Sequence, residues 1–286
     1  MKDKITIIAT YILFVYGISV LWRYIGQYFP RMIGNVNITS FYIMLLFAII
    51  FLIIKLIDKK PFSHYGFKKF NYKQFKLMIW FLFLVMPLAF LARVVDPGFD
   101  AWYASRSGLD TFTGFMIFAL IMPFFVIKEE LVVRAIFQNK LHKYGFWWMA
   151  VGLSTAFAIA HYFPSPTGHT WMQTASVLIG SFILVACYEL TKNIWLSIML
   201  HLFYNVIIIL QIYLHVTNPT NEIIFWVIVL GIFAYLFVKM LINRKHYKNY
   251  FAHFKKGFKA IRPWEIAFLI TFALIVPLLM IWIMYS

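Results

Sequence analysis

The sequence predicts an all-α, polytopic transmembrane helical bundle of about eight or nine spans that encloses a polar cavity. Two observations lead to this fold class. The 286 residues are 63% hydrophobic and only 13% charged, whereas a soluble domain is about 45–50% apolar and about 25% charged. Apolar runs near 20 residues, the length that crosses a bilayer as a helix, recur along the whole chain.

Nine apolar runs are long enough to be membrane spans. Helices are expected in all of them, because every backbone polar group in lipid must be paired within the protein. No small-residue cleavage site follows the first run, so we interpret it as a retained span. The expected spans are residues 5–22, 40–57, 75–95, 111–138, 147–163, 171–190, 194–216, 222–242 and 264–285.

The distribution of basic residues predicts the topology. Cytoplasmic loops of membrane proteins are enriched in Lys and Arg. With the N-terminus in the cytoplasm, most of the 26 basic residues fall on the inner side of the nine spans. The outer side receives only Arg23, Arg31, Arg93 and Arg106. We therefore expect a cytoplasmic N-terminus and an outer C-terminus.

Two cytoplasmic stretches, 58–76 and 243–262, are strongly basic and rich in aromatics. Such stretches are attracted to the anionic headgroups of a bilayer, so the net charge of +16 does not predict nucleic-acid binding. The abundance of Phe, Ile and Lys favours a bacterial cell membrane. The lone cysteine, Cys187, excludes a disulfide within the chain and is interpreted as a packing residue.

The first polar motif is Glu129-Glu130-x-x-x-Arg134, near the end of an apolar run. Ionisable groups are rare in such segments and tend to face an interior cavity. Glu130 and Arg134 are neighbours on one helix face and form an internal brace, which is costly to break when buried. Glu129 is rotated by about 100° from Glu130 and is free to act as a general base. The alternative is a structural cluster in which both acids pair with Arg134 and Lys128.

The second and third motifs are Phe157-x-x-x-His161 and His201-x-x-x-Asn205. In each pair the two residues share a helix face, so Phe157 can wall the imidazole of His161. His201 and Asn205 form a plausible oxyanion-binding pair. The alternatives are a hydrogen-bonded core histidine for His161, and for His201 and Asn205 a polar clasp between helices.

The fourth and fifth spans form an antiparallel hairpin that turns near Gly145, and this hairpin aligns the motifs in depth. Glu129 and His161 lie equally far from Gly145 along the chain, so they are expected at matching heights. His201 reaches the same height if the hairpin 139–146 extends into the cytoplasm. We therefore expect all three motifs to line one chamber.

The three motifs, in this order and in successive apolar spans, resemble those of the CPBP family, the CAAX-protease and bacteriocin-processing intramembrane proteases, also called Abi. Tyr65-Gly-Phe-Lys-Lys and Tyr188-Glu-Leu-Thr191-Lys-Asn-Ile-Trp195 are also similar to the family. The resemblance implies that Glu129 and His161 activate water and that His201 and Asn205 hold the oxyanion. It gives Glu130 and Arg134 supporting positions.

The chain departs from the family pattern at two positions. Val133 stands where the family usually has an aromatic residue, and Ala135 where it usually has glycine. Two histidines and a glutamate could ligate zinc, but there is no His-Glu-x-x-His pattern, so we expect a metal-free mechanism in which a glutamate is the base.

These observations predict an intramembrane endopeptidase that hydrolyses a membrane-associated peptide or protein precursor. The expected organisation is N-terminal spans and a basic loop over 1–110, a catalytic core over 111–216 and C-terminal spans over 217–286. Two alternatives stay open. One is a non-catalytic scaffold that acts in bacteriocin immunity or regulation, and the other is a proton-coupled transporter, which no inverted repeat supports.

Overall fold

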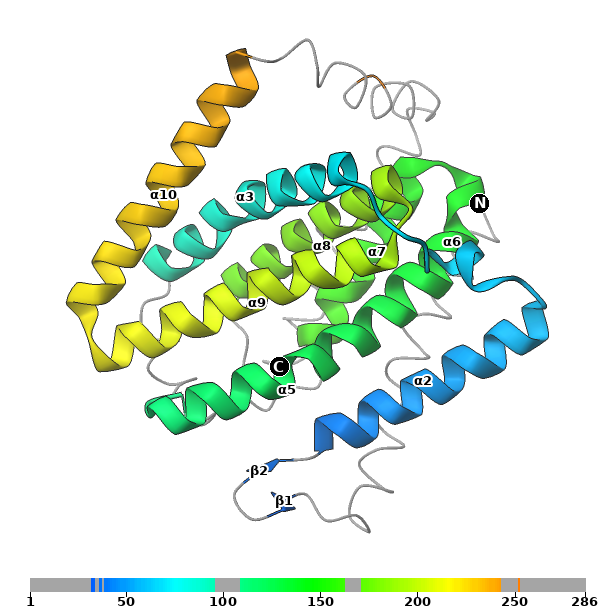
Figure 1. The fold of residues 1–286 in the computed structure, drawn as a ribbon, viewed down its shortest axis with the longest axis horizontal. Helices are drawn as coiled ribbons and strands as arrows, with labels where there is room; N and C mark the ends of the chain where they lie inside the picture. The colour runs from blue at the N-terminus through cyan, green and yellow to red at the C-terminus, as the bar shows by residue number, and fades with distance from the viewer. Residues whose placement is uncertain are drawn as a thin grey trace, which may run out of the picture.

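The computed structural model describes residues 32–33, 36–37, 39–95, 109–162, 171–242 and 252. Seven long helices make up most of this part of the chain, and they run from 17 residues in α7 to 24 in α3, α9 and α10 (Figure 1). Their bounds are α2 Thr39–Asp58, α3 Tyr72–Val95, α5 Phe112–Glu130, α7 Phe146–Tyr162, α8 Trp171–Thr191, α9 Ile194–Thr217 and α10 Pro219–Ile242.

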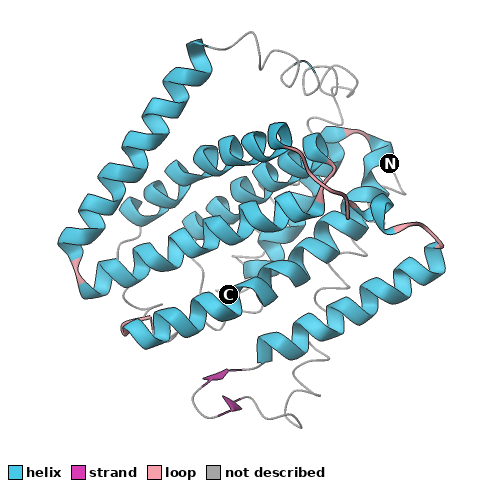
Figure 2. Ribbon diagram, in the orientation of Figure 1, coloured by secondary structure: helices cyan, strands magenta, loops and turns pink. Residues whose placement is uncertain are grey.

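The remaining described elements are short (Figure 2). Strands β1 (Met32–Ile33) and β2 (Val36–Asn37) pair antiparallel before α2. The other short elements are the 3-10 turns η2 (Phe62–Tyr65) and η4 (His142–Tyr144), the π-helix η3 (Leu131–Gln138) and the one-turn helix α6 (Asn139–Leu141). The predicted all-α class is therefore confirmed, with one two-residue strand pair added.

The expected helices that fall on described residues are all present, with ends shifted by a few residues. Apart from the span 111–138, the largest shifts are at α3, which begins at Tyr72 rather than at residue 75, and at α10, which begins at Pro219 rather than at residue 222. The expected spans 5–22 and 264–285 and the basic stretch 243–262 lie outside the described residues.

The expected regular helix over 111–138 needs a correction. It is α-helical only to Glu130, and the next eight residues wind as a π-helix. Every residue of η3 is buried, and η3 packs against α2, α7, α8 and α9. Because the segment is enclosed on all sides, its tertiary contacts determine that it is π-helical. The pattern of apolar residues in the sequence does not indicate this conformation.

Two described helices have the length and mean hydropathy to cross a membrane, Ile194–Thr217 and Pro219–Lys239. The count of eight or nine spans is not confirmed. The outer surfaces nevertheless suit lipid, because α2 and α10 carry large apolar side chains that are exposed. On α10 these are Ile223, Ile224, Val227, Ile228, Ile232, Tyr235, Phe237, Val238, Leu241 and Ile242. A patch of this size on a soluble protein would be an aggregation hazard.

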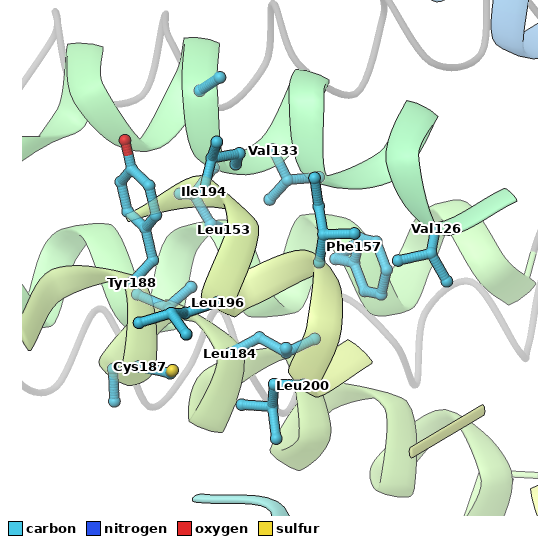
Figure 3. Close-up of a cluster of buried hydrophobic side chains, with 14 of the residues drawn as sticks. Val126, Val133, Leu153, Phe157, Leu184, Cys187, Tyr188, Ile194, Leu196 and Leu200 are labelled. Atoms are coloured by element: carbon cyan, nitrogen blue, oxygen red, sulfur yellow. The ribbon is translucent and has the colours of Figure 1, made fainter. Parts of the chain in front are cut away.

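Helix α9 is the centre of the bundle. It packs against α3, α5, α8 and α10, while α7 lies on α8 and α2 lies on α5 (Figure 1). Apolar side chains from α5, η3, α7, α8 and α9 meet in one cluster (Figure 3). Cys187 is fully buried in this cluster, which confirms its interpretation as a packing residue.

Local sequence fixes where the helices begin. Asn193 caps α9, because its side-chain oxygen accepts from the backbone N–H groups of Trp195 (3.0 Å) and Leu196 (3.4 Å). Asn71 and Gln74 form a reciprocal capping box at the start of α3. Gly145 supplies the positive φ of +94° at which the hairpin turns into α7. The turn predicted near this glycine is confirmed.

Candidate active site

The two glutamates at the end of α5 have different surroundings. Glu130 is completely buried, and it is held by three partners on two elements. The hydroxyl of Ser197 donates to its Oε2 at 2.5 Å, and Nδ1 of His201 lies 2.9 Å from its Oε1. The Nε of Arg134 forms an ion pair with Oε2 at 3.3 Å. All of these groups are needed to offset the cost of burying the charge.

Glu129 is partly exposed, with 22% of its side-chain surface accessible. Its Oε2 lies 3.7 Å from Nε2 of His201 and 4.0 Å from Nε2 of His161. Its Oε1 lies 4.0 Å from Nζ of Lys128. These distances are too long for hydrogen bonds, so no hydrogen bond to a described residue fixes the Glu129 carboxylate. A water molecule placed beside such a pair can hydrogen-bond to both groups.

The orientation of His161 is fixed by its own helix. Its Nδ1 lies 2.9 Å from the carbonyl oxygen of Phe157, one turn earlier on α7. A carbonyl oxygen only accepts, so Nδ1 must carry the proton. In the neutral ring Nε2 is then an acceptor, and it is this nitrogen that faces Glu129. The arrangement lets His161 receive a proton at Nε2.

His201 is fixed in the same sense by a carboxylate. Its Nδ1 donates to Glu130, so its Nε2 faces Glu129. His201 therefore lies between the two glutamates, and it can act as a hydrogen-bond donor at Nε2 only as the imidazolium.

Phe157 packs against both imidazoles and the guanidinium. Its ring centroid is 4.3 Å from that of His161 and 6.2 Å from that of His201. The guanidinium carbon of Arg134 lies 5.8 Å from the same ring, within the range of a cation–π contact. The expected apolar wall beside His161 is thus present, and it also covers Arg134.

The structure therefore brings together most of the residues singled out by sequence. Glu129, Glu130, Arg134, Phe157, His161 and His201 form one continuous cluster. Asn205 lies one turn beyond His201 on α9 and is half-buried, and its amide donates to the sulfur of Met122 on α5 at 3.4 Å. A thioether is a weak acceptor, so this amide is loosely held.

Sequence reasoning missed two features of the site. Ser197 is fully buried and bonded to Glu130. The spacing of Ser197, His201 and Asn205 at four-residue intervals on one face of an apolar helix could have indicated it. Glu130 also orients His201, in addition to bracing Arg134. The two departures from the family pattern, Val133 and Ala135, are buried apolar residues. In the described part of the chain, no group of three or more His, Cys, Asp or Glu is arranged to hold a metal ion.

The three polar motifs meet inside an apolar helical bundle. This arrangement is typical of one class of protein, the helical membrane proteins with a buried glutamate–histidine site. Residues 111–207 match the family model described as Rce1-like, the type II CAAX prenyl endopeptidase Rce1-like family. The match spans all three motifs and confirms the resemblance to the CAAX-protease family; it supports a hydrolase, an intramembrane protease of the CAAX type. No curated protein and no solved structure matches the chain.

Proposed function

We propose that this protein is an intramembrane endopeptidase that cleaves a membrane-associated peptide or protein precursor with water activated by Glu129 and His161. The observation that carries the proposal is the 4.0 Å separation between Glu129 Oε2 and His161 Nε2. That gap is too wide for a direct hydrogen bond and suits one shared water. The neighbouring Glu130, in contrast, has all of its partners in place.

In the proposed mechanism Glu129 and His161 orient the water and accept its proton as it attacks the scissile carbonyl. The accepting atoms are the carboxylate of Glu129 and Nε2 of His161, whose Nδ1 is committed to the Phe157 carbonyl. A proton taken up here can then pass to the leaving amine. General acid–base catalysis of this kind contributes about 10²- to 10⁴-fold.

His201 and Asn205 stabilise the oxyanion in this proposal. His201 would donate from Nε2 as the imidazolium, with its Nδ1 held by Glu130. Asn205 would exchange its weak bond to the Met122 sulfur for one to the oxyanion. Donors arranged in advance toward developing charge are worth about 10²- to 10³-fold each.

The substrate is proposed only as a class. The matched family is described as prenyl endopeptidases, and prenylation makes a protein membrane-associated. A peptide or protein precursor held at the membrane therefore suits a site that opens inside the bundle. We retain the expectation of a metal-free reaction in which Glu129 is the base.

The test is a comparison of the peptides in membranes and medium of host cells that carry the wild type, Glu129→Gln or no protein. A peptide or new terminus present only with the wild type would identify both the reaction and the substrate. If the three samples have the same peptides while Glu129→Gln keeps a cellular phenotype of the wild type, the proposal is wrong and a non-catalytic immunity or regulatory scaffold is favoured.

We further propose that the chain lies in a bacterial cell membrane with its N-terminus in the cytoplasm. Single-cysteine labelling tests the orientation, because the native Cys187 is buried. Lys60 and Thr220 are exposed at opposite ends of the bundle. A thiol reagent that does not cross the membrane should label the Lys60→Cys variant only after the membrane is permeabilised. The same reagent should label the Thr220→Cys variant in intact cells. The reverse pattern would invert the topology.

A further inference from the structure

A groove of about 630 Å³ lies at the end of the bundle where α9 begins. The segment that follows η2 supplies one wall, and the start of α9 supplies the other. The residues that line the groove are Phe67, Lys68, Lys69, Phe70 and Trp195. Two adjacent cations and three aromatic rings therefore face one open space, which the proposed cleavage site does not use. Apart from Phe70, the lining residues belong to the two stretches 65–69 and 188–195 that also resemble the family.

The two walls are joined across a long stretch of sequence. The carbonyl oxygen of Gly66 accepts from the N–H of Ile194 at 2.9 Å, and that of Lys68 accepts from the Asn193 amide at 2.7 Å. The Phe67 and Trp195 rings meet edge to face at 5.5 Å. Gly66 has a φ of +87°, and a Cβ there would lie 2.8 Å from the Tyr188 ring. Hydrogen bonds and ring contacts between its two walls therefore fix the shape of the groove.

The charge in the groove is not neutralised by the protein. Lys68 and Lys69 are exposed, and neither has an acidic partner among the described residues. The acids at this end of the bundle are already engaged. Asp58 accepts from Tyr65 at 3.1 Å and lies 3.8 Å from Lys140, and Glu189 pairs with Lys192 at 2.7 Å.

The aromatic rings indicate which anion fits. Phe70 and Trp195 are 44% and 45% exposed, directly beside the start of an apolar spanning helix. Aromatic residues with lysines at the end of such a helix are typical of the headgroup level of a bilayer. A soluble anion would need the lysines but not the exposed rings.

We propose that this groove binds the headgroup of an anionic phospholipid, with the phosphate between Lys68 and Lys69 and the glycerol and upper acyl chains against Phe67 and Trp195. This site is independent of the proposed protease activity. It also adjoins the cap of the helix that carries His201, because Lys68 and Asn193 are directly bonded.

The test uses the full chain in lipid nanodiscs and the fluorescence of its 10 tryptophans. Phosphatidylcholine discs receive a minor fraction of lipid brominated near the headgroup, either phosphatidylglycerol or phosphatidylcholine. The Trp195 signal is the difference between wild type and Trp195→Phe. We expect brominated phosphatidylglycerol to quench the Trp195 signal at least about fivefold more effectively than brominated phosphatidylcholine does. The reason is that each basic residue strengthens the attraction to an anionic lipid about fivefold.

Two double variants with the same charge loss make the test specific. Lys68→Gln/Lys69→Gln should remove the preference for phosphatidylglycerol. Lys73→Gln/Lys76→Gln changes two exposed lysines of the same basic stretch that do not line the groove, and it should keep the preference. Equal loss in both variants would mean diffuse attraction and overturn the proposal. So would equal quenching by the two brominated lipids, or binding of a labelled acidic peptide that depends on Lys68 and Lys69 without any lipid preference.

Discussion

Helix α9 carries a histidine near each of its ends, each facing a glutamate of a neighbouring helix, and the two pairs are built differently. Near the C-terminus of α9 both oxygens of Glu222 have a close partner, because one accepts from Gln211 at 3.0 Å and the other lies 2.9 Å from Nδ1 of His215. Two turns from its N-terminus, His201 faces Glu129 across 3.7 Å, which is not a hydrogen bond.

The difference separates a structural tie from a reactive site. Glu222 joins α9 to α10 through two hydrogen bonds of 2.9–3.0 Å. Glu129 lies near two imidazoles without a hydrogen bond to either, so its carboxylate keeps acceptor sites for a reactant. A glutamate faces a histidine of α9 in both places, but the carboxylate–imidazole distance is 2.9 Å at Glu222 and 3.7 Å at Glu129.

The change expected to have the largest effect is Glu129→Gln. It removes the proposed base while keeping the shape, so cleavage of the substrate should fall by about 10²- to 10⁴-fold. The melting temperature in detergent should stay near the wild-type value, because Glu129 makes no short bond that the fold requires. The assay is cleavage per folded molecule. If Glu129→Gln instead unfolds the protein, Glu129 has a structural role like that of Glu222.

Arg134→Ala should lower the stability of the protein by about 3–5 kcal/mol, because it leaves the buried Glu130 without its ion-pair partner. The measurement is thermal or denaturant unfolding of the purified protein, together with its abundance in membranes. Arg134→Lys should recover part of the loss. A stable but inactive Arg134→Ala protein would instead give Arg134 a direct part in the chemistry.

Glu222→Gln tests the other half of the comparison. The charged hydrogen bonds to Gln211 and His215 weaken, which should cost about 1.5–3 kcal/mol of stability. Cleavage per folded molecule should be unchanged. A loss of activity at full stability would show that the two ends of α9 are coupled, and the contrast drawn between them would fail.

Ser197→Ala should cost about 1–2 kcal/mol, because the buried Glu130 loses one donor. The matched control is Ser181→Ala. Ser181 is equally buried, on α8, and its hydroxyl has no hydrogen-bond partner among the residues that the structure describes, so its removal should be nearly neutral. Equal losses from the two changes would mean that the bond to Glu130 contributes little.

Metal removal is expected to have the smallest effect. Dialysis against a chelator should leave cleavage unchanged if Glu129 acts as the base without a metal. The measurement is cleavage before and after dialysis, and again after zinc is added. Activity lost on dialysis and restored by zinc would replace the proposed mechanism with a metal-assisted one.

Sequence alone predicted the helices and the meeting of the polar motifs, because long apolar runs and the cost of isolated polar groups in lipid constrain both. It did not predict Ser197, since a serine in an apolar helix often bonds its own backbone. It also did not predict that Glu130 would orient His201, because that contact depends on how α5 and α9 cross. The carboxylate–imidazole distance, which distinguishes Glu129 from Glu222, likewise depends on how the helices pack.

The π-helix after Glu130 changes the angle about the helix axis between the glutamates before it and Gln138 at its end. Each residue of an α-helix advances about 100° around the axis, and a π-helical turn holds more residues and so advances less per residue. Over Leu131–Gln138 the difference accumulates, so that Gln138 can donate to the Val185 carbonyl at 3.0 Å while Glu129 and Glu130 keep their directions. Deleting one residue here would let the segment rewind as an α-helix, and the bond of Gln138 to Val185 and the contacts of Glu130 with α9 could then not both be kept.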